Sequence, residues 1–323
     1  MKAIVQETYG SADVLEFREV EVPEVGDAEV LVRVRAAGCG PDVWHVMTGL
    51  PYLARASVGQ RRPKIATPGG DLAGTVEGAG SSVSGFRPGD EVMGVGKGSF
   101  AELSVAPAEK LVRKPSNLSF EEAAAIPISG MTALQAIRDV AKVRPGQSVL
   151  VIGAGGGVGT LTVQVAKAFG AKVTGVASGS KLDLVRSLGA DDAIDYTKES
   201  FTDGTRRWDV IVDSAGRRPL SELRRAMAPK GTLVIVGGDG GGRWTGGFFR
   251  GILRGPVMSL FVGQRMRGLV SKETKKDLET LRQMIEAGQI RPVIDRTYPL
   301  VEASDAIRYM EGGHPRGKVV ITV

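Results

Sequence analysis

The segment 149–159 (VLVIGAGGGVG) constrains the fold of this 323-residue chain more than any other. It begins with an apolar run of strand length and ends in a turn that contains five glycines. The residues after the turn place Val158, Leu161 and Val165 on one face at helical spacing. A strand, a tight glycine turn and a helix in this order form the first half of a parallel βαβ unit.

The glycines in this turn are spaced in a way that a simple packing turn does not require. Gly153, Gly156 and Gly159 follow one another at intervals of three residues. In this order they suit a tight turn, a close approach of backbone to phosphate, and close packing of the helix on the strand. We therefore predict that the loop binds the diphosphate of a dinucleotide at the start of the helix.

The choice of dinucleotide depends on the end of the second strand, which we expect at 172–178. A site for NAD carries an acidic residue there, whereas residues 178–181 read SGSK. The Ser178 hydroxyl and the Lys181 cation suit a 2′-phosphate, which predicts NADPH rather than NADH. Asp183 stands at capping-box spacing after Ser180, so we interpret this first acid as structural.

The wider sequence divides into two parts with different patterns of apolar residues. Up to about residue 120, short β-type segments are separated by Gly, Pro and Asp, which predicts an antiparallel, barrel-like β domain. From about residue 121 to residue 238, apolar strands alternate with helices, which predicts a doubly wound parallel sheet. We predict an α/β fold with domains at 1–122 and 123–289, and a tail, 290–323, that returns to the first domain.

The composition of the chain indicates which kinds of partner and which cell compartment to expect. The net charge is +6 and aromatic residues make up 5% of the chain, which does not indicate a nucleic-acid surface. The single cysteine excludes an intramolecular disulfide and fits a reducing compartment. The start, MKAIVQETYG, lacks the apolar run of a signal peptide, so we expect a soluble, cytoplasmic protein without membrane contact.

Several segments together resemble one known family. They are AAGCGPDVWHVMTG (36–49), PGGDLAGTVEGAGSSVSGFRPGDEVMG (68–94), IPISGMTALQAI (126–137), GAGGGVG (153–159) and SLGADDAIDY (187–196). The chain resembles the medium-chain dehydrogenase/reductase superfamily, in particular its zinc-independent quinone oxidoreductase (zeta-crystallin-like) branch. The resemblance implies a GroES-like β domain plus a Rossmann domain, with substrate and nicotinamide between them. It also implies a homodimer through the edge strand of the Rossmann sheet, near residues 233–236.

The resemblance also implies which residues bind the cofactor. Tyr196 ends the third strand, where it either flanks the adenosine phosphate or is a core or surface tyrosine. Gly237 and Gly238 lie at the end of a later strand, where such sheets meet their ligands. The complete predicted set is Thr132, Gly153, Gly156, Gly157, Val158, Gly159, Ser178, Lys181, Tyr196, Ser214, Gly237, Gly238 and Lys318.

The metal ligands of the zinc-dependent relatives have no counterparts in this chain. Gly40 occupies the cysteine position, with Cys39 one place early, and Gly70 occupies the histidine position. The whole chain holds one cysteine and two histidines, His45 and His314, so a four-cysteine site is impossible. We predict that no metal is bound and that Cys39 is a small buried hydrophobic residue.

Without a metal, hydrogen-bond donors must stabilise the charge that develops on a carbonyl oxygen during hydride transfer. We predict NADPH-dependent reduction of a quinone or an α,β-unsaturated carbonyl. By resemblance Tyr52 is the candidate catalytic donor, although one extra residue precedes it and packing is the alternative role. Trp44 and His45 either line the substrate site or belong to the surrounding structure.

Two other functions remain open from the sequence. Reduction of an enoyl thioester is compatible with every motif above. The segment 241–272 combines arginines with apolar residues, which indicates either a hydrophobic lid or a basic surface for a membrane or a protein partner. In the latter case the chain is an NADPH-binding interaction module. The apolar residues are Trp244, Phe248, Phe249, Leu253, Leu260 and Phe261.

Overall fold

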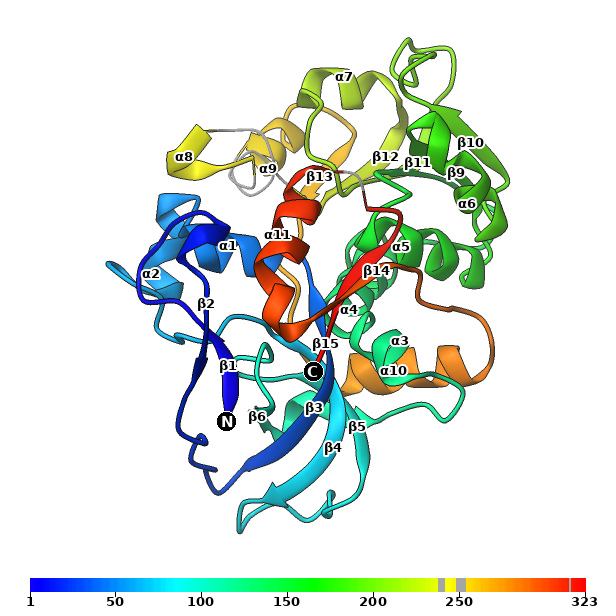
Figure 1. Cartoon of the computed structure of the whole chain (residues 1–323). Helices are drawn as coiled ribbons and strands as arrows, with labels where there is room; N and C mark the ends of the chain where they lie inside the picture. Colours follow the sequence, from blue (N-terminus) through cyan, green and yellow to red (C-terminus); the bar gives the residue numbers. More distant parts are fainter. Residues whose placement is uncertain (238–241, 248–253, 314) are drawn as a thin grey trace. The chain divides into compact units, whose positions relative to one another are not determined.

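The computed structural model (Figure 1) describes residues 1–237, 242–247, 254–313 and 315–323. Contacts divide the chain into two compact units. The first unit contains Met1–Met131, Glu273–Gly288 and Pro292–Val323, and the second contains Thr132–Lys272 and Gln289–Arg291. Gly238, Phe248, Phe249, Leu253 and His314, all named in the sequence analysis, lie outside the described residues.

The first unit is built on a seven-stranded sheet whose strand order is β14-β15-β3-β4-β5-β7, with β6 also paired to β3. All the pairs are antiparallel except β14 with β15. A separate antiparallel pair joins β1 (Lys2–Val5) to β2 (Glu16–Glu19). The sheet strands are β3 (Glu29–Cys39), β4 (Asp71–Ala79), β5 (Glu91–Val95), β6 (Leu103–Pro107), β7 (Leu111–Arg113), β14 (Ile294–Pro299) and β15 (Lys318–Thr322).

The alternation of side chains in β3 explains how this sheet forms its core. Val30, Val32 and Val34 are buried, while the residues between them are partly or fully exposed, so one face packs inward. The C-terminal strand β15 pairs with β3, with Val320 opposite Gly38, which places the end of the chain in the first unit. This architecture is the GroES-like β domain that the sequence predicts.

Helices cover the sheet of the first unit and connect its strands. A capping box between Ser119 and Glu122 starts α3. The helices are α1 (Pro41–Thr48), α2 (Arg55–Val58), α3 (Phe120–Ala124), α10 (Lys275–Glu286), α11 (Ala303–Glu311) and the first residues of α4 (Pro127–Gln135).

The boundary between the units falls later in the chain than the sequence analysis places it. Asn117 Nδ2 donates to the carbonyl oxygen of Ile285, which ties α10 to the first unit. A Cβ on Gly130 would lie 3.0 Å from Leu281 Cδ1, so the start of α4 also packs on α10. Residues 123–131 and α10 therefore belong with the β domain because their contacts are there.

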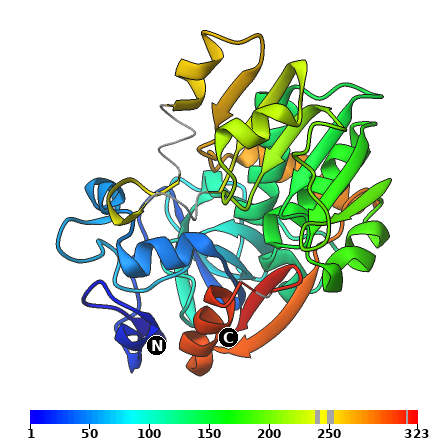
Figure 2. The ribbon, with the colours of Figure 1, turned by 90° about the horizontal axis from the view of Figure 1, so that it is seen from above.

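The second unit is a six-stranded parallel sheet in the order β10-β9-β8-β11-β12-β13. Its strand order reverses between β8 and β11, the point at which doubly wound sheets bind ligands. Figure 2 gives a second view of these strands and of the helices on their faces. The strands are β8 (Ser148–Ile152), β9 (Lys172–Ala177), β10 (Asp192–Asp195), β11 (Trp208–Asp213), β12 (Met227–Ile235) and β13 (Arg265–Gly268). The helices are α5 (Gly157–Ala168), α6 (Leu182–Ser187), α7 (Leu220–Arg225), α8 (Gly242–Thr245) and α9 (Gly255–Ser259).

The edge strand of this sheet differs from the prediction. Residues 233–236 belong to or follow β12, which has β11 on one side and β13 on the other. The segment 255–268 supplies α9 and β13, with Leu233 paired to Met266. The predicted edge near 233–236 is therefore wrong: β13 is the edge strand on this side of the described sheet, and β10 is the edge strand on the other side. In the described part of the chain, no helix is long and apolar enough to cross a membrane.

Candidate functional site

The glycine loop lies where β8 passes into α5, at the C-terminal edge of the parallel sheet. The backbone N–H groups of Gly153 and Ala154 both donate to the Val176 carbonyl oxygen, at 3.1 and 3.0 Å, which ties the loop to β9. Gly153 has a φ of +79°, a backbone conformation that side chains disfavour. The tight turn predicted for Gly153 is present.

Two other glycines have different spatial reasons to lack a side chain. A Cβ on Gly159 would lie 2.0 Å from the Gly153 carbonyl oxygen, so α5 packs on the loop only because residue 159 is glycine. A Cβ on Gly156 would meet no atom closer than 3.6 Å. Gly156 is the N-cap of α5 and gives it no side-chain cap. The N–H groups that open α5, which include those of Gly157 and Val158, therefore suit an anion, and the loop fits a diphosphate.

We predict that Gly156→Ala and Gly159→Ala will impair different properties, the first dinucleotide binding and the second stability. Gly159→Ala should lower the free energy of unfolding by about 1–3 kcal/mol because its methyl overlaps the Gly153 carbonyl. Gly156→Ala should leave that value close to wild type and weaken dinucleotide binding about tenfold or more, because its methyl lies where the phosphate approaches. Urea unfolding and calorimetric titration measure the two effects. Equal dinucleotide affinity of Gly156→Ala and wild type would contradict the binding role.

Lys181 lies against the glycine loop from the neighbouring strand connection. A Cβ on Gly155 would lie 2.7 Å from Lys181 Cδ and 3.0 Å from Lys181 Cβ. Ser178 directly follows β9 and is the N-cap of the short helical turn η5 (Gly179–Lys181). The structure thus places Lys181, one of the two predicted 2′-phosphate residues, beside the predicted diphosphate loop.

The capping box predicted for Asp183 is absent. Its side chain is 97% exposed and pairs with Arg186 at 3.2 Å. The N-cap of α6 is Lys181, and no side-chain cap bond is present there. The physical reason is that the turn η5 precedes α6, so Ser180 lies inside that turn instead of at the cap position.

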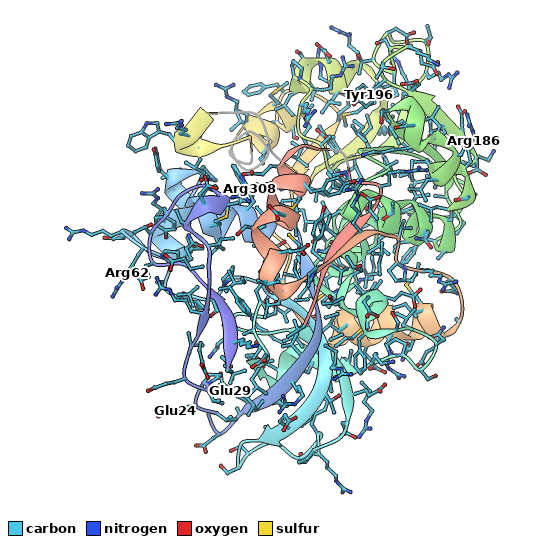
Figure 3. The ribbon with its side chains drawn as sticks, viewed as in Figure 1. Glu24, Glu29, Arg62, Arg186, Tyr196 and Arg308 are labelled. Carbon is cyan, nitrogen blue, oxygen red and sulfur yellow. The ribbon has the colours of Figure 1, made fainter. Side chains whose placement is uncertain are left out.

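The end of β10 contributes one predicted residue and one that the sequence analysis missed. Tyr196 is 47% exposed, and its backbone N–H donates to the Ala177 carbonyl at the end of β9 (Figure 3). The preceding Asp195 is buried, and its Oδ1 accepts hydrogen bonds from Thr197 N and Oγ1. These bonds lower the pKa of Asp195, so its carboxylate stays ionised, and its Oδ2 lies 2.6 Å from where a Cβ on Gly179 would be. The sequence signal that could have identified Asp195 was an acidic residue at the end of the β-type segment 192–195.

The later strands also end at the glycine loop. Ser214 Oγ donates to the Ile152 carbonyl oxygen at 2.7 Å, and it lies 2.8 Å from where a Cβ on Gly153 would be. A Cβ on Gly237 would lie 2.3 Å from the Ser214 carbonyl oxygen. Thr132 is buried on α4 in the second unit. The ends of β8, β11 and β12 are thereby brought together, and the cofactor contacts of these residues remain predictions.

Lys318 lies in the first unit, in a buried cluster of polar groups. Its Nζ donates to Asp71 Oδ2 at 2.8 Å and to Ser129 Oγ at 3.2 Å, and the Lys318 and Asp71 side chains are at most 5% exposed. Asp71 Oδ1 also accepts from the Ile128 N–H in the first turn of α4. Burial raises the pKa of Asp71 to about 6, against the opposing effect of the Lys318 charge. The cluster therefore gives Lys318 a structural role, and its predicted contact with cofactor is a separate proposal.

We predict that Lys318→Met will lower the free energy of unfolding by about 3–5 kcal/mol, because it leaves the Asp71 carboxylate buried without a counter-charge. The double variant Asp71→Asn/Lys318→Met should recover a large part of that loss, since the amide carries no charge and its oxygen still accepts from the Ile128 N–H. Guanidinium unfolding of the three proteins is the measurement. Identical midpoints for Lys318→Met and wild type would contradict the coupling.

The positions that hold zinc ligands in metal-dependent relatives are filled differently here. A Cβ on Gly40 would lie 2.5 Å from Asp42 Oδ1 and 3.1 Å from Lys318 Nζ, so the buried cluster occupies the space of a side chain at residue 40. Cys39 is buried, and desolvation raises the pKa of its thiol to about 12. Among the described residues, no group of three or more His, Cys, Asp or Glu side chains could hold a metal ion.

The candidate substrate residues lie in the first unit, in and after α1. His45 Nδ1 is 2.8 Å from the Leu50 carbonyl oxygen, which can only accept, so Nδ1 carries a proton. The Trp44 and His45 rings meet edge to face at 5.0 Å, and Trp44 Nε1 donates to Glu311. Tyr52 begins the helical turn η2 (Tyr52–Ala54), and its ring faces the Arg55 guanidinium at 4.7 Å.

Arg55 is a residue near this candidate site that the sequence analysis missed. Its guanidinium lies over the Tyr9 ring at 4.3 Å and over the Tyr52 ring at 4.7 Å, and its Nε donates to the Gly49 carbonyl oxygen. These cation–π contacts hold Tyr52 beside a positive charge. The sequence signal was an arginine three residues after the candidate tyrosine.

Comparison with known proteins agrees with this geometry. The alcohol dehydrogenase GroES-like domain family matches residues 26–116, and the family described as zinc-binding dehydrogenase matches residues 188–321. The chain is 37% identical to 2-methylene-furan-3-one reductase of Solanum lycopersicum and 36% identical to the chloroplastic NADPH-dependent alkenal/one oxidoreductase of Arabidopsis thaliana. Each alignment covers 99% of this chain and 79% of the relative. The structure of the quinone oxidoreductase from Coxiella burnetii matches with a TM-score of 0.87 at 28% identity, covering 100% of this chain and 99% of that one.

A GroES-like domain joined to a six-stranded Rossmann sheet with an open glycine loop defines an oxidoreductase that uses a nicotinamide dinucleotide. The chain belongs to the medium-chain dehydrogenase/reductase superfamily, among the quinone oxidoreductase and alkenal reductase relatives.

Proposed function

We propose that this protein reduces a quinone or an α,β-unsaturated carbonyl compound with NADPH and without a metal. The observation that carries the proposal is the Lys181 side chain beside Gly155, with Ser178 directly after β9, where NAD sites hold an acid. This arrangement suits a dinucleotide with an additional phosphate. The alkenal and quinone reductases among the relatives support the class of acceptor.

Each part of the second unit then has a defined task. The N–H groups of Gly157 and Val158 bind the diphosphate, and Ser178 and Lys181 bind the 2′-phosphate. Tyr196 covers the adenosine end, while Ser214 and Gly237 shape the edge of the sheet. Thr132 contacts the nicotinamide half, as the family resemblance implies, and the same resemblance gives Lys318, a residue of the first unit, a contact with the cofactor. Bound NADPH supplies the hydride.

In the first unit, Tyr52 donates a hydrogen bond to the carbonyl oxygen of the acceptor. Negative charge develops on that oxygen, and a fixed donor stabilises it most in a site from which water is excluded. Arg55 holds the Tyr52 ring and adds a positive charge nearby. Trp44 provides an apolar wall for a planar acceptor, and His45 lines the same site.

We also propose a homodimer, with β13 as its contact strand. β13 is one of the two edge strands of the described sheet, and Leu260 and Phe261 just before it are 80% and 83% exposed. An edge strand with exposed apolar neighbours is suited to pairing with a second copy.

The choice of cofactor is tested by Lys181→Gln. Loss of one charge-assisted hydrogen bond should weaken NADPH binding about tenfold and leave NADH binding unchanged. The matched control is Arg186→Gln. It removes the cation that forms an ion pair with Asp183, and it should change neither the NADPH affinity nor the NADH affinity. Fluorescence titration with both cofactors measures this. Equal weakening of NADPH and NADH by Lys181→Gln would remove the assignment.

The reaction is tested with 1,4-benzoquinone, a 2-alkenal and a crotonyl thioester, with NADPH consumption as the readout. We expect turnover of at least one of these acceptors. Tyr52→Phe should lower kcat about 100-fold for the accepted compound, because the donor hydroxyl is lost. An unchanged kcat for every accepted substrate would end the donor role of Tyr52.

A further inference from the structure

A surface of the first unit carries positive charge that no carboxylate balances among the described residues. No acidic residue occurs between Asp42 and Asp71, a stretch that contains four Lys or Arg residues. Three of these side chains, Arg61, Arg62 and Lys64, are exposed, and in the described part of the chain none of them forms an ion pair. Other cations of the same unit have carboxylate partners, including Arg18, Arg33, Lys97, Arg113 and Arg308.

These three cations are held in place by a closed loop, residues 59–64, which we call the basic loop. The Lys64 N–H donates to the Val58 carbonyl oxygen at 2.8 Å, which joins the two ends of the loop. Gly59 has a φ of +131°, and a Cβ there would lie 2.0 Å from the Arg62 carbonyl oxygen. Pro63 is buried, while Arg62 projects outward (Figure 3). The backbone therefore holds three positive charges close together, and these charges repel one another until an anion binds.

The basic loop is linked to the candidate donor through the side chains of Tyr9 and Arg55. Tyr9 Oη donates to the Gly59 carbonyl oxygen, and the Tyr9 ring faces the same Arg55 guanidinium that faces Tyr52. Two apolar side chains near the loop, Leu53 and Ile65, are 53% and 47% exposed. The surface next to Tyr52 thus combines apolar area with the three cations of the basic loop.

We propose that the basic loop binds the phosphate groups of an unsaturated acyl thioester, whose acyl end lies beside Tyr52. This inference rests on the proposed function and names its class of acceptor. Quinones and small alkenals carry no anion and would gain nothing from Arg61, Arg62 and Lys64. A phosphorylated tail gains charge-assisted hydrogen bonds from them, and its apolar part has Leu53 and Ile65 to contact.

The test compares crotonyl-coenzyme A, which carries phosphates, with the neutral thioester S-crotonyl-N-acetylcysteamine. With saturating NADPH, wild type should have a KM about tenfold lower for the coenzyme A thioester, at similar kcat. R61Q/R62Q should raise that KM about tenfold and leave the KM for the neutral thioester unchanged. The control R87Q/K276Q removes two exposed cations elsewhere in the first unit and should change neither KM.

A binding measurement separates this inference from the proposed function. Free coenzyme A is titrated calorimetrically into protein saturated with NADP⁺, so that its adenosine phosphate does not compete for the cofactor site. Binding that weakens in R61Q/R62Q and with added salt supports the basic loop without any turnover.

Three results would overturn the inference. The first is an equal KM of the wild type for both thioesters. The second is an equal effect of R61Q/R62Q on the KM values for both thioesters. The third is that R61Q/R62Q no longer binds anionic phosphatidylserine vesicles while its KM values for the thioesters are unchanged. The last result would assign the loop to a membrane surface instead. Absence of turnover with every quinone, alkenal and thioester would refute the proposed function, and coenzyme A binding would still report on the loop.

Discussion

The approach of α5 to the turn after β8 is the contact on which the nucleotide half of this protein depends. A methyl group at residue 159 would lie 2.0 Å from the Gly153 carbonyl oxygen, so the helix start reaches its position only with a bare α-carbon there. That position brings the uncapped N–H groups of α5 to the carboxyl edge of the sheet. At the same edge, Ser178 and Lys181 follow β9, Tyr196 follows β10 and Ser214 follows β11. A single steric constraint thus positions the start of α5 next to the ends of several separate strands.

In the first unit, a buried polar cluster lies beside the positions that the sequence analysis compares with zinc ligands. Gly40 and Gly70 replace ligand positions, and the Lys318 ammonium lies 3.1 Å from where a side chain at residue 40 would begin. Its charge is balanced by Asp71, which also holds the first turn of α4 through Ile128. Desolvation of two charges costs several kcal/mol, and the hydrogen bonds to Ser129 and Ile128 offset part of that cost. A buried ion pair therefore supplies local order next to Gly40, one of the two positions that the sequence analysis compares with zinc ligands.

Much of this arrangement could be predicted from sequence because its signals are local. The apolar run 149–152, the spaced glycines and the SGSK segment each lie within a few residues, and the fold and the glycine loop followed from them. Other features depend on distant residues. Lys318 and Asp71 are separated by 247 positions, and nothing near either residue identifies the other as its partner. The edge strand β13 reads RMRG, too short and too polar to be read as a strand before its pairing with β12 is known. Asp183 was misread because a short helical turn shifts the cap by one residue.

The distribution of charge links the candidate donor to its surroundings. Arg55 forms no ion pair within the described residues; its guanidinium contacts two aromatic faces and the Gly49 carbonyl, so its charge is not cancelled. A hydroxyl that shares its proton with a reduced carbonyl acquires negative charge, and an uncancelled cation within about 5 Å of the Tyr52 ring lowers the energy of that state. In the proposed reaction, this cation would act on the charge that develops at the acceptor without having to move, because packing and the Gly49 carbonyl already hold it beside Tyr52.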